Sequence, residues 1–184
     1  MPLQQWIEET FINQGATLYN EDHQHLQGAM IGCLWSNVPN NREMRTVLAT
    51  AEIFNPKGNA WQKARQENQL LRWFGDIPDF IITVFAPYAV EADEASFCAL
   101  IEHELYHCAQ RTDADGSPKF KSDGSPAYGI KGHDVEEFTG VVRRYGVDAA
   151  QSGVGQLVAA AKMKPILSGA KIKQACGTCA LRAV

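Results

Sequence analysis

Two histidines, His103 and His107, stand four residues apart with Glu104 between them in the stretch HELYH. Histidines with this spacing lie one turn apart on the same face of an α-helix, so their ring nitrogens can bind one metal ion. A carboxylate directly after the first histidine can reach a metal-bound water without binding the metal, as a general base does. The spacing therefore predicts a hydrolytic zinc site with His103 and His107 as ligands and Glu104 as the base.

A third ligand is expected, because a catalytic zinc usually has three protein ligands and keeps one position for water. The stretch GHDVEEF at 132–138 offers candidates. We favour His133, because an acidic first turn suits a helix dipole and explains the carboxylates but not the histidine. Glu136 and Glu137 are the alternatives, since a glutamate from a second helix can complete such a site. A carboxylate that does not bind the metal could instead orient a ligating imidazole.

The elements that must position these residues are a helix and the strand before it. Residues 79–85, DFIITVF, are the clearest predicted strand, and residues 91–110 are the best predicted helix, with Asp93 as its N-cap. The apolar residues of this helix share one face: Phe97, Leu100, Ile101, Leu105 and Cys108. The two histidines lie on another face, which is free for a metal.

Other segments complete a small α+β fold. Helical spacing predicts helices over 3–12, 60–74 and 134–145, and β-branched content predicts a strand over 46–54. The tetrapeptide DGSP occurs twice, at 115–118 and 123–126, and is typical of a turn-rich loop or hairpin. We expect one domain over residues 1–184, in which 165–184 is a C-terminal tail.

Composition excludes several classes of protein. The chain has 184 residues, of which 45% are hydrophobic and 21% charged, as in ordinary globular proteins. Its apolar runs are shorter than the ~20 residues of a membrane span, and its N-terminus lacks the basic region of a secretory signal. A net charge of -4 does not indicate nucleic-acid binding. We therefore expect a cytoplasmic protein without a membrane partner.

The five cysteines do not have the spacing of a disulfide framework, which also favours a reducing compartment. Cys176 and Cys179 form a CxxC pair, which is half of a structural zinc site and a candidate second metal site. His23 and His25 could supply its other ligands, as could Cys33, or the pair could be two free thiols. Cys98 and Cys108 flank the predicted metal ligands, and we expect both to pack in the core.

The two stretches HELYH and GHDVEEF, with DFII at 79–82 and RRYG at 143–146, resemble a family of metallopeptidases found largely in bacteriophages and prophages. The resemblance implies a compact zincin-like domain, loosely similar to SprT-like proteases. In such a domain a small sheet packs against the HExxH helix, and a second helix bears a ligand. It also implies His103, His107 and His133 as zinc positions and Glu104 as the catalytic residue.

The function expected from these features is that of a zinc metallopeptidase acting on a peptide or protein substrate. Two alternatives share most of the evidence. One is a zinc amidase that acts on a cell-wall crosslink or another amide, and it would use the same residues. The other is a noncatalytic binding protein stabilised by zinc, for which Glu104 would have no evident role.

Overall fold

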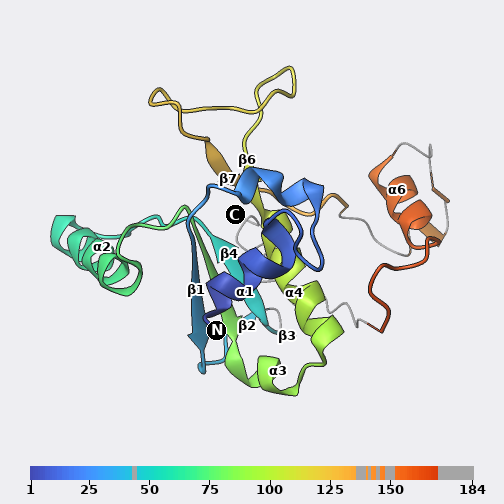
Figure 1. The fold of residues 1–184 in the computed structure, drawn as a ribbon, viewed down its shortest axis with the longest axis horizontal. Coiled ribbons are helices and arrows are strands. Elements are labelled where there is room, and N and C mark those ends of the chain that lie inside the picture. Colours follow the sequence, from blue (N-terminus) through green and yellow to red (C-terminus); the bar gives the residue numbers. More distant parts are fainter. Residues whose placement is uncertain (43–44, 136–139, 141, 144–145, 148–151, 170–184) are drawn as a thin grey trace.

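The computed structural model describes the chain except residues 43–44, 136–139, 141, 144–145, 148–151 and 170–184. The fold is mixed α/β, with a small central sheet and helices around it (Figure 1), which confirms the fold class expected from the sequence. Among the described residues, no helix is long and apolar enough to cross a membrane.

The elements follow one another along the chain as short helices and strands. They are α1 (Leu3–Ile7), the π-helix η1 (Glu8–Ile12), the 3-10 helix η2 (Glu21–Leu26), β1 (Ile31–Ser36), β2 (Asn41–Arg42), β3 (Arg45–Thr46), β4 (Ala49–Glu52), α2 (Ala60–Phe74), β5 (Phe80–Phe85), α3 (Ala86–Glu91), α4 (Glu94–His107), β6 (Cys108–Gln110), β7 (Tyr128–Ile130) and α6 (Gly153–Ala160).

The central sheet has the strand order β1-β5-β4, with β5 parallel to β1 and antiparallel to β4. Strand β5 is the predicted strand at 79–85, and its sequence FIITVF is almost wholly buried. A continuous apolar run of this kind suits a strand that is covered on both faces. Leu100, Ile101 and Leu105 of α4 belong to the same core, together with Phe11 of η1.

Several predicted elements have the expected bounds. Helix α2 coincides with the predicted helix at 60–74, and α1 with η1 covers the one at 3–12. Asn59 and Gln62 form a capping box at the start of α2, and Gly75 ends it with a φ of 82°, a conformation that glycine adopts without strain. In α4, the Asp93 side chain accepts a hydrogen bond from the Ser96 amide, as an N-cap does.

Two predicted elements have the wrong bounds. The helix expected over 91–110 ends at His107, and its last three residues instead form β6, which pairs with β7. The residues before it form a separate helix, α3, and the strand expected over 46–54 is reduced to β4 at 49–52. In the first case the hydrogen bonds to a distant strand outweigh local helix propensity, which is a weak preference.

The connection between β6 and β7, which we call the arm (residues 111–127), extends away from the sheet (Figure 1). Its two DGSP copies build the same turn: Ser117 donates to the Asp115 carboxylate, and Ser125 donates to the Asp123 carboxylate. The Lys119 amide donates to the Arg111 carbonyl, and the arm closes where the Arg111 amide donates to the Ala127 carbonyl. The loop expected from the sequence is thus a repeated turn with its own hydrogen bonds.

The predicted helix at 134–145 falls largely on residues outside the described part of the chain. Within it, residues 140, 142 and 143 are helical. His133 lies before this stretch in the segment that follows β7, so it is not itself on a helix. Much of the proposed C-terminal tail, residues 170–184, is also outside the described residues.

Candidate metal centre

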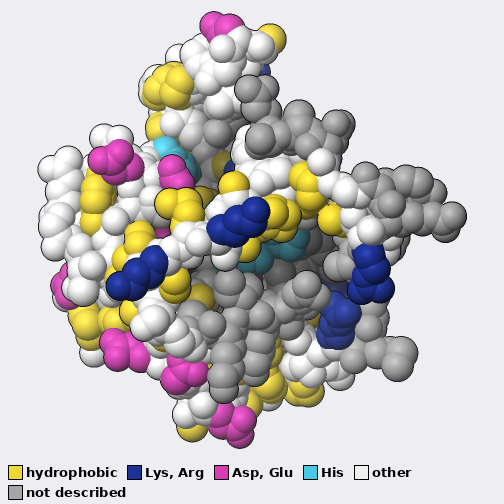
Figure 2. All heavy atoms as spheres, turned by 90° about the vertical axis from the view of Figure 1, so that its right-hand side faces the viewer, with side chains coloured by type: hydrophobic (Ala, Val, Ile, Leu, Met, Phe, Trp, Pro, Cys, Tyr) yellow, Lys and Arg dark blue, Asp and Glu magenta, His cyan; other side chains and the backbone are white. Residues whose placement is uncertain are grey.

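His103, His107 and His133 lie together, and their ligand atoms are all within 4.8 Å of one another. The first two come from the last turns of α4, and the third follows β7. Histidine side chains are visible in the middle of one face, with Lys and Arg side chains nearby (Figure 2). The structure therefore brings together the three residues that the sequence analysis proposed as ligands.

The spacing of the three imidazoles fits a metal ion better than it fits hydrogen bonding. His103 Nε2 is 3.2 Å from His107 Nε2 and 3.2 Å from His133 Nε2. A ring nitrogen has either one N–H or one lone pair, so only one of these contacts can be a hydrogen bond. Ligand nitrogens in tetrahedral zinc sites are ~3.4 Å apart when the Zn–N distance is ~2.1 Å. The cluster has nearly this geometry and suggests a metal ion.

The orientation of His107 is fixed by a backbone carbonyl. Its Nδ1 is 2.7 Å from the carbonyl oxygen of Lys131. Because a carbonyl can only accept, Nδ1 carries the proton and donates it, which leaves the lone pair on Nε2. This nitrogen faces the other two rings, so the tautomer required of a metal ligand is set by the fold.

The hairpin of β6 and β7 explains how His133 returns to α4 over 26 positions of sequence. Cys108 pairs with Ile130, and the Lys131 amide donates to the His107 carbonyl at 2.9 Å. Lys131 is therefore bound to His107 through both its amide and its carbonyl. His133 follows Lys131 by two residues. Its position is therefore determined by the register of β6 with β7, and not by the length of the arm.

Glu104 is fully buried, with no exposed surface, on the turn of α4 between the two histidines. A carboxylate is seldom buried to this degree unless it serves a partner or a reaction. Two thiols of the fold, those of Cys33 and Cys108, have raised pKa values, which disfavours the nucleophilic thiolate. Burial raises the pKa of the Cys108 thiol, and the charge of Glu104 raises it further. Burial, and after it the charge of Glu8, raises the pKa of the Cys33 thiol to about 12. Cys98 and Cys108 are buried, as the sequence analysis expected.

A second polar cluster, which the sequence analysis missed, holds α4 in place beside the histidines. Asn20 donates to Glu102 and to the Tyr106 hydroxyl at 2.9 Å each, and Tyr106 donates to Asp22 at 2.9 Å. His23 is buried with its Nε2 3.7 Å from Glu102. The imidazole of His23, and after it the Asn20 amide, lower the pKa of the Glu102 carboxyl. We call Asn20, Asp22, His23, Glu102 and Tyr106 the clamp.

The clamp and the metal ligands use neighbouring faces of the same helix. Residues 102 and 106 are four apart, as are 103 and 107, so each pair forms a stripe, and the two stripes are about 100° apart around the helix. Helix η2 contacts one stripe, and His133 approaches the other. The signal for the clamp in the sequence is the spacing of Glu102 and Tyr106, but nothing local identifies Asn20 as their partner.

Other proposed ligands have different outcomes. Glu136, Glu137, Cys176 and Cys179 lie outside the described residues. The histidines suggested as partners for the CxxC pair are engaged within the fold. His25 Nε2 is 2.7 Å from the Cys108 carbonyl and donates to it, and His23 belongs to the clamp. Neither geometry favours a shared site with the cysteines.

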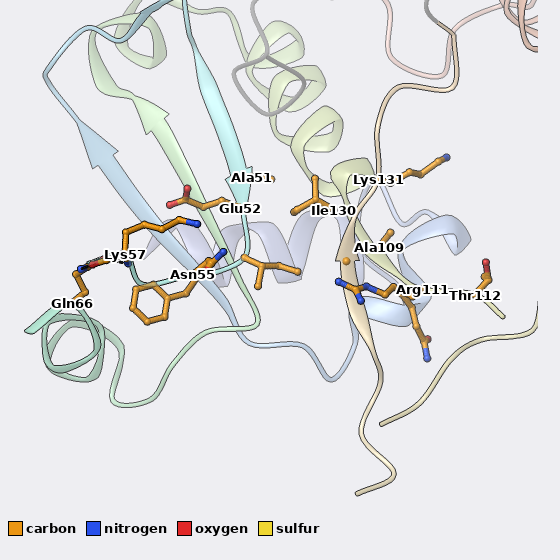
Figure 3. A pocket seen from close by; sticks show the side chains of 14 residues that line it. Ala51, Glu52, Asn55, Lys57, Gln66, Ala109, Arg111, Thr112, Ile130 and Lys131 are labelled. Carbon is orange, nitrogen blue, oxygen red and sulfur yellow. Dashed lines mark hydrogen bonds between the residues drawn. The ribbon is translucent and has the colours of Figure 1, made fainter. Parts of the chain in front are cut away.

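A cleft of about 1450 Å³ borders the β6–β7 hairpin. One wall consists of β4 and the segment that follows it, with Gln66 of α2, and the other consists of β6, β7 and the start of the arm (Figure 3). Lys131 belongs to the cleft and also orients His107 through its carbonyl. The three histidines are not among the residues that line the cleft, so the cleft and the metal centre are connected through Lys131.

Comparison with known proteins gives one match. The model of the family described as "Putative phage metallopeptidase" matches residues 4–162, which is most of the chain. No curated protein and no solved structure is significantly similar to the chain. The match includes every described residue of the metal centre, the clamp and the cleft.

Proposed function

Because the chain belongs to this family of phage metallopeptidases, we propose that it is a zinc-dependent peptidase in which His103, His107 and His133 hold the metal and Glu104 is the general base. The observation that carries the proposal is the convergence of three Nε2 atoms beside a buried carboxylate. Three imidazole ligands with an open fourth position are a common donor set for catalytic zinc. The family name supports a peptide or protein as the substrate.

Each residue has a distinct part in the proposed reaction. Zinc, when bound, would lower the pKa of a water molecule to about 7 and polarise the scissile carbonyl. Glu104 would take the proton from the attacking water and later deliver it to the leaving amine. Lys131 would keep His107 in the tautomer that leaves Nε2 free for the metal. The buried position of Glu104 would keep this carboxylate out of bulk water, where its proton transfer could be lost.

The first prediction tests this assignment through Glu104→Gln. The variant should keep about one zinc per chain and lose peptide hydrolysis by about 10²–10⁴-fold in kcat, as expected when a general base is removed. Metal content by atomic emission and cleavage of a labelled casein would measure the two properties. Glu94→Gln, which replaces an exposed carboxylate on the first turn of the same helix, should change neither.

Two results would contradict the proposal. Purified protein that does not bind zinc, even after metal is added, would exclude the site. A Glu104→Gln variant that loses its zinc would show that the carboxylate is a ligand and not the base. If the variant kept both its zinc and the full activity of the wild type, a noncatalytic role for Glu104 would follow.

A further inference from the structure

We propose that the cleft that shares Lys131 with the support of the metal centre selects peptide substrates that carry an acidic side chain, recognised by Lys57 and Arg111. This inference rests on the proposed peptidase function and names its substrate class. It starts from the position of the two cations. Figure 3 shows Lys57 entering the cleft from the wall formed by the segment after β4, and Arg111 from the wall formed by the β6–β7 hairpin.

Lys57 is positioned by a two-way contact with α2. The Gln66 amide donates to the Lys57 carbonyl at 2.7 Å, and the Lys57 amide donates to the Gln66 side-chain oxygen at 3.2 Å (Figure 3). Both residues line the cleft. The capping box at Asn59 fixes the start of the helix that carries Gln66. The backbone of Lys57 is thus held at the wall although its side chain is exposed.

Arg111 lies against Gly129 of the neighbouring strand, which has no side chain to obstruct it. A Cβ added at Gly129 would lie 2.9 Å from both Cγ and Nε of Arg111, so the arginine side chain crosses β7 where only glycine leaves room. The backbone of Arg111 is also bound at the base of the arm, through its amide to Ala127 and its carbonyl to Lys119. The guanidinium therefore has a supported route along the wall of the cleft.

The charges of the cleft are not balanced internally. Lys131 is neutralised by Asp134 at 2.6 Å. Within the described part of the chain, no carboxylate lies within 4.0 Å of the Lys57 or Arg111 side-chain nitrogens. Glu52 is the acidic residue of the lining, so Lys57 and Arg111 outnumber it even with Lys131 paired. Two cations from opposite walls are left to attract an anion.

The surroundings of these cations favour a peptide carboxylate over a nucleic-acid backbone. Ile53, Phe54 and Ile130 give the lining an apolar part, which suits the side chains of an extended peptide. A polyanion would need a longer basic surface, and the arm next to Arg111 carries the exposed carboxylates of Asp115 and Asp123. A carboxylate side chain accepts charge-assisted hydrogen bonds from lysine and from arginine.

The test uses zinc-loaded protein and a set of peptides of one apolar sequence, in which Glu, Gln or Lys occupies one position at a time around the cleaved bond. Wild-type protein should cleave the best Glu peptide with a kcat/KM about tenfold above that of its Gln counterpart, and the Lys peptide should be the poorest. Lys57→Gln combined with Arg111→Gln should reduce the ratio of Glu to Gln peptides to about one. Arg111→Glu should reverse the preference towards Lys.

Two controls keep the outcomes distinct. Lys121→Gln removes a cation of the arm that does not line the cleft, and it should keep the wild-type ratio. Gly129→Ala keeps both charges but displaces Arg111, and should lower the ratio. Thermal melting of each variant would show that the fold is intact.

Failure of the inference differs from failure of the proposed function. Equal cleavage of the Glu, Gln and Lys peptides by the wild type would overturn the substrate preference and leave the peptidase intact. If no peptide were cleaved, the proposed function would fail, and fluorescence anisotropy with zinc-loaded Glu104→Gln would decide the rest. Tighter binding of the Glu peptides would support recognition by the cleft, and equal binding would overturn it.

Discussion

Two histidine environments flank the C-terminal half of α4, and they differ in how many ring nitrogens converge. In the candidate metal centre, His103 Nε2 is 3.2 Å from each of two other imidazole nitrogens. In the clamp, the neighbours of His23 are not histidines. Its Nε2 is 3.7 Å from the Glu102 carboxylate, and its ring centroid is 4.7 Å from that of Tyr106. Both His23 and His107 are about equally buried, at 1% and 2% exposure.

The comparison teaches that burial does not identify a metal ligand. His107 has its Nδ1 proton held by a carbonyl, so its remaining nitrogen can only accept or ligate. The imidazole of His23 faces a carboxylate and the edge of a tyrosine ring, which suits a packing role. One environment would bind a metal, and the other would hold the helix that presents the ligands.

The largest expected difference concerns zinc, through His103→Ala. Removing the histidine that contacts both other ligands should weaken zinc binding by more than about 100-fold, which exceeds the loss usually caused by changes around a ligand. Peptide hydrolysis should fall to background. Competition with a chromogenic zinc chelator would measure the affinity. Unchanged zinc affinity would mean that the three imidazoles are not the metal site.

The sequence predicted the residues of the metal centre better than the residues that support it. The i, i+4 spacing of His103 and His107 is a local property of a helix, and it was sufficient to propose the pair. The proximity of His133 depends on the register of β6 with β7, where Cys108 lies opposite Ile130. Because that pairing spans the whole arm, no local pattern indicated it. For the same reason, the C-terminal end of α4 was predicted three residues too late, at 110 and not at His107.

The fold shows the same division between local and distant signals. Helix α2 was predicted with correct bounds from its helical spacing, and in the structure a capping box and a C-terminal glycine mark its ends. Strand β1, which pairs with β5 from Ile31 opposite Phe80, was not predicted, since its residues GCLWS do not alternate clearly. The clamp was missed for a related reason: Asn20 and Glu102 are 82 residues apart in sequence.

A smaller effect, on stability, should follow from His23→Ala. The variant should keep its zinc, because His23 lies in the clamp and not among the ligands. It should lose about 2–4 kcal/mol of unfolding free energy, since a buried ring is replaced by a cavity. Chemical denaturation of the zinc-free protein, which removes any contribution from metal binding, would measure the loss. If zinc were lost while the fold stayed stable, the two environments would not be distinct.

The smallest effect is expected for Tyr106→Phe, and it separates the clamp from the chemistry most finely. Tyr106 stands between His103 and His107 in sequence, and a hydroxyl at this position could in principle stabilise an oxyanion. Its hydroxyl instead accepts from Asn20 and donates to Asp22. Because the side chain is 42% exposed, water can replace part of these bonds, and we expect a loss of about 0.5–1 kcal/mol in stability. Zinc content and kcat should remain close to those of the wild type.

A fall of 10²-fold or more in kcat at unchanged stability would instead move Tyr106 from the clamp to the reaction, because removing one oxyanion donor has an effect of that size.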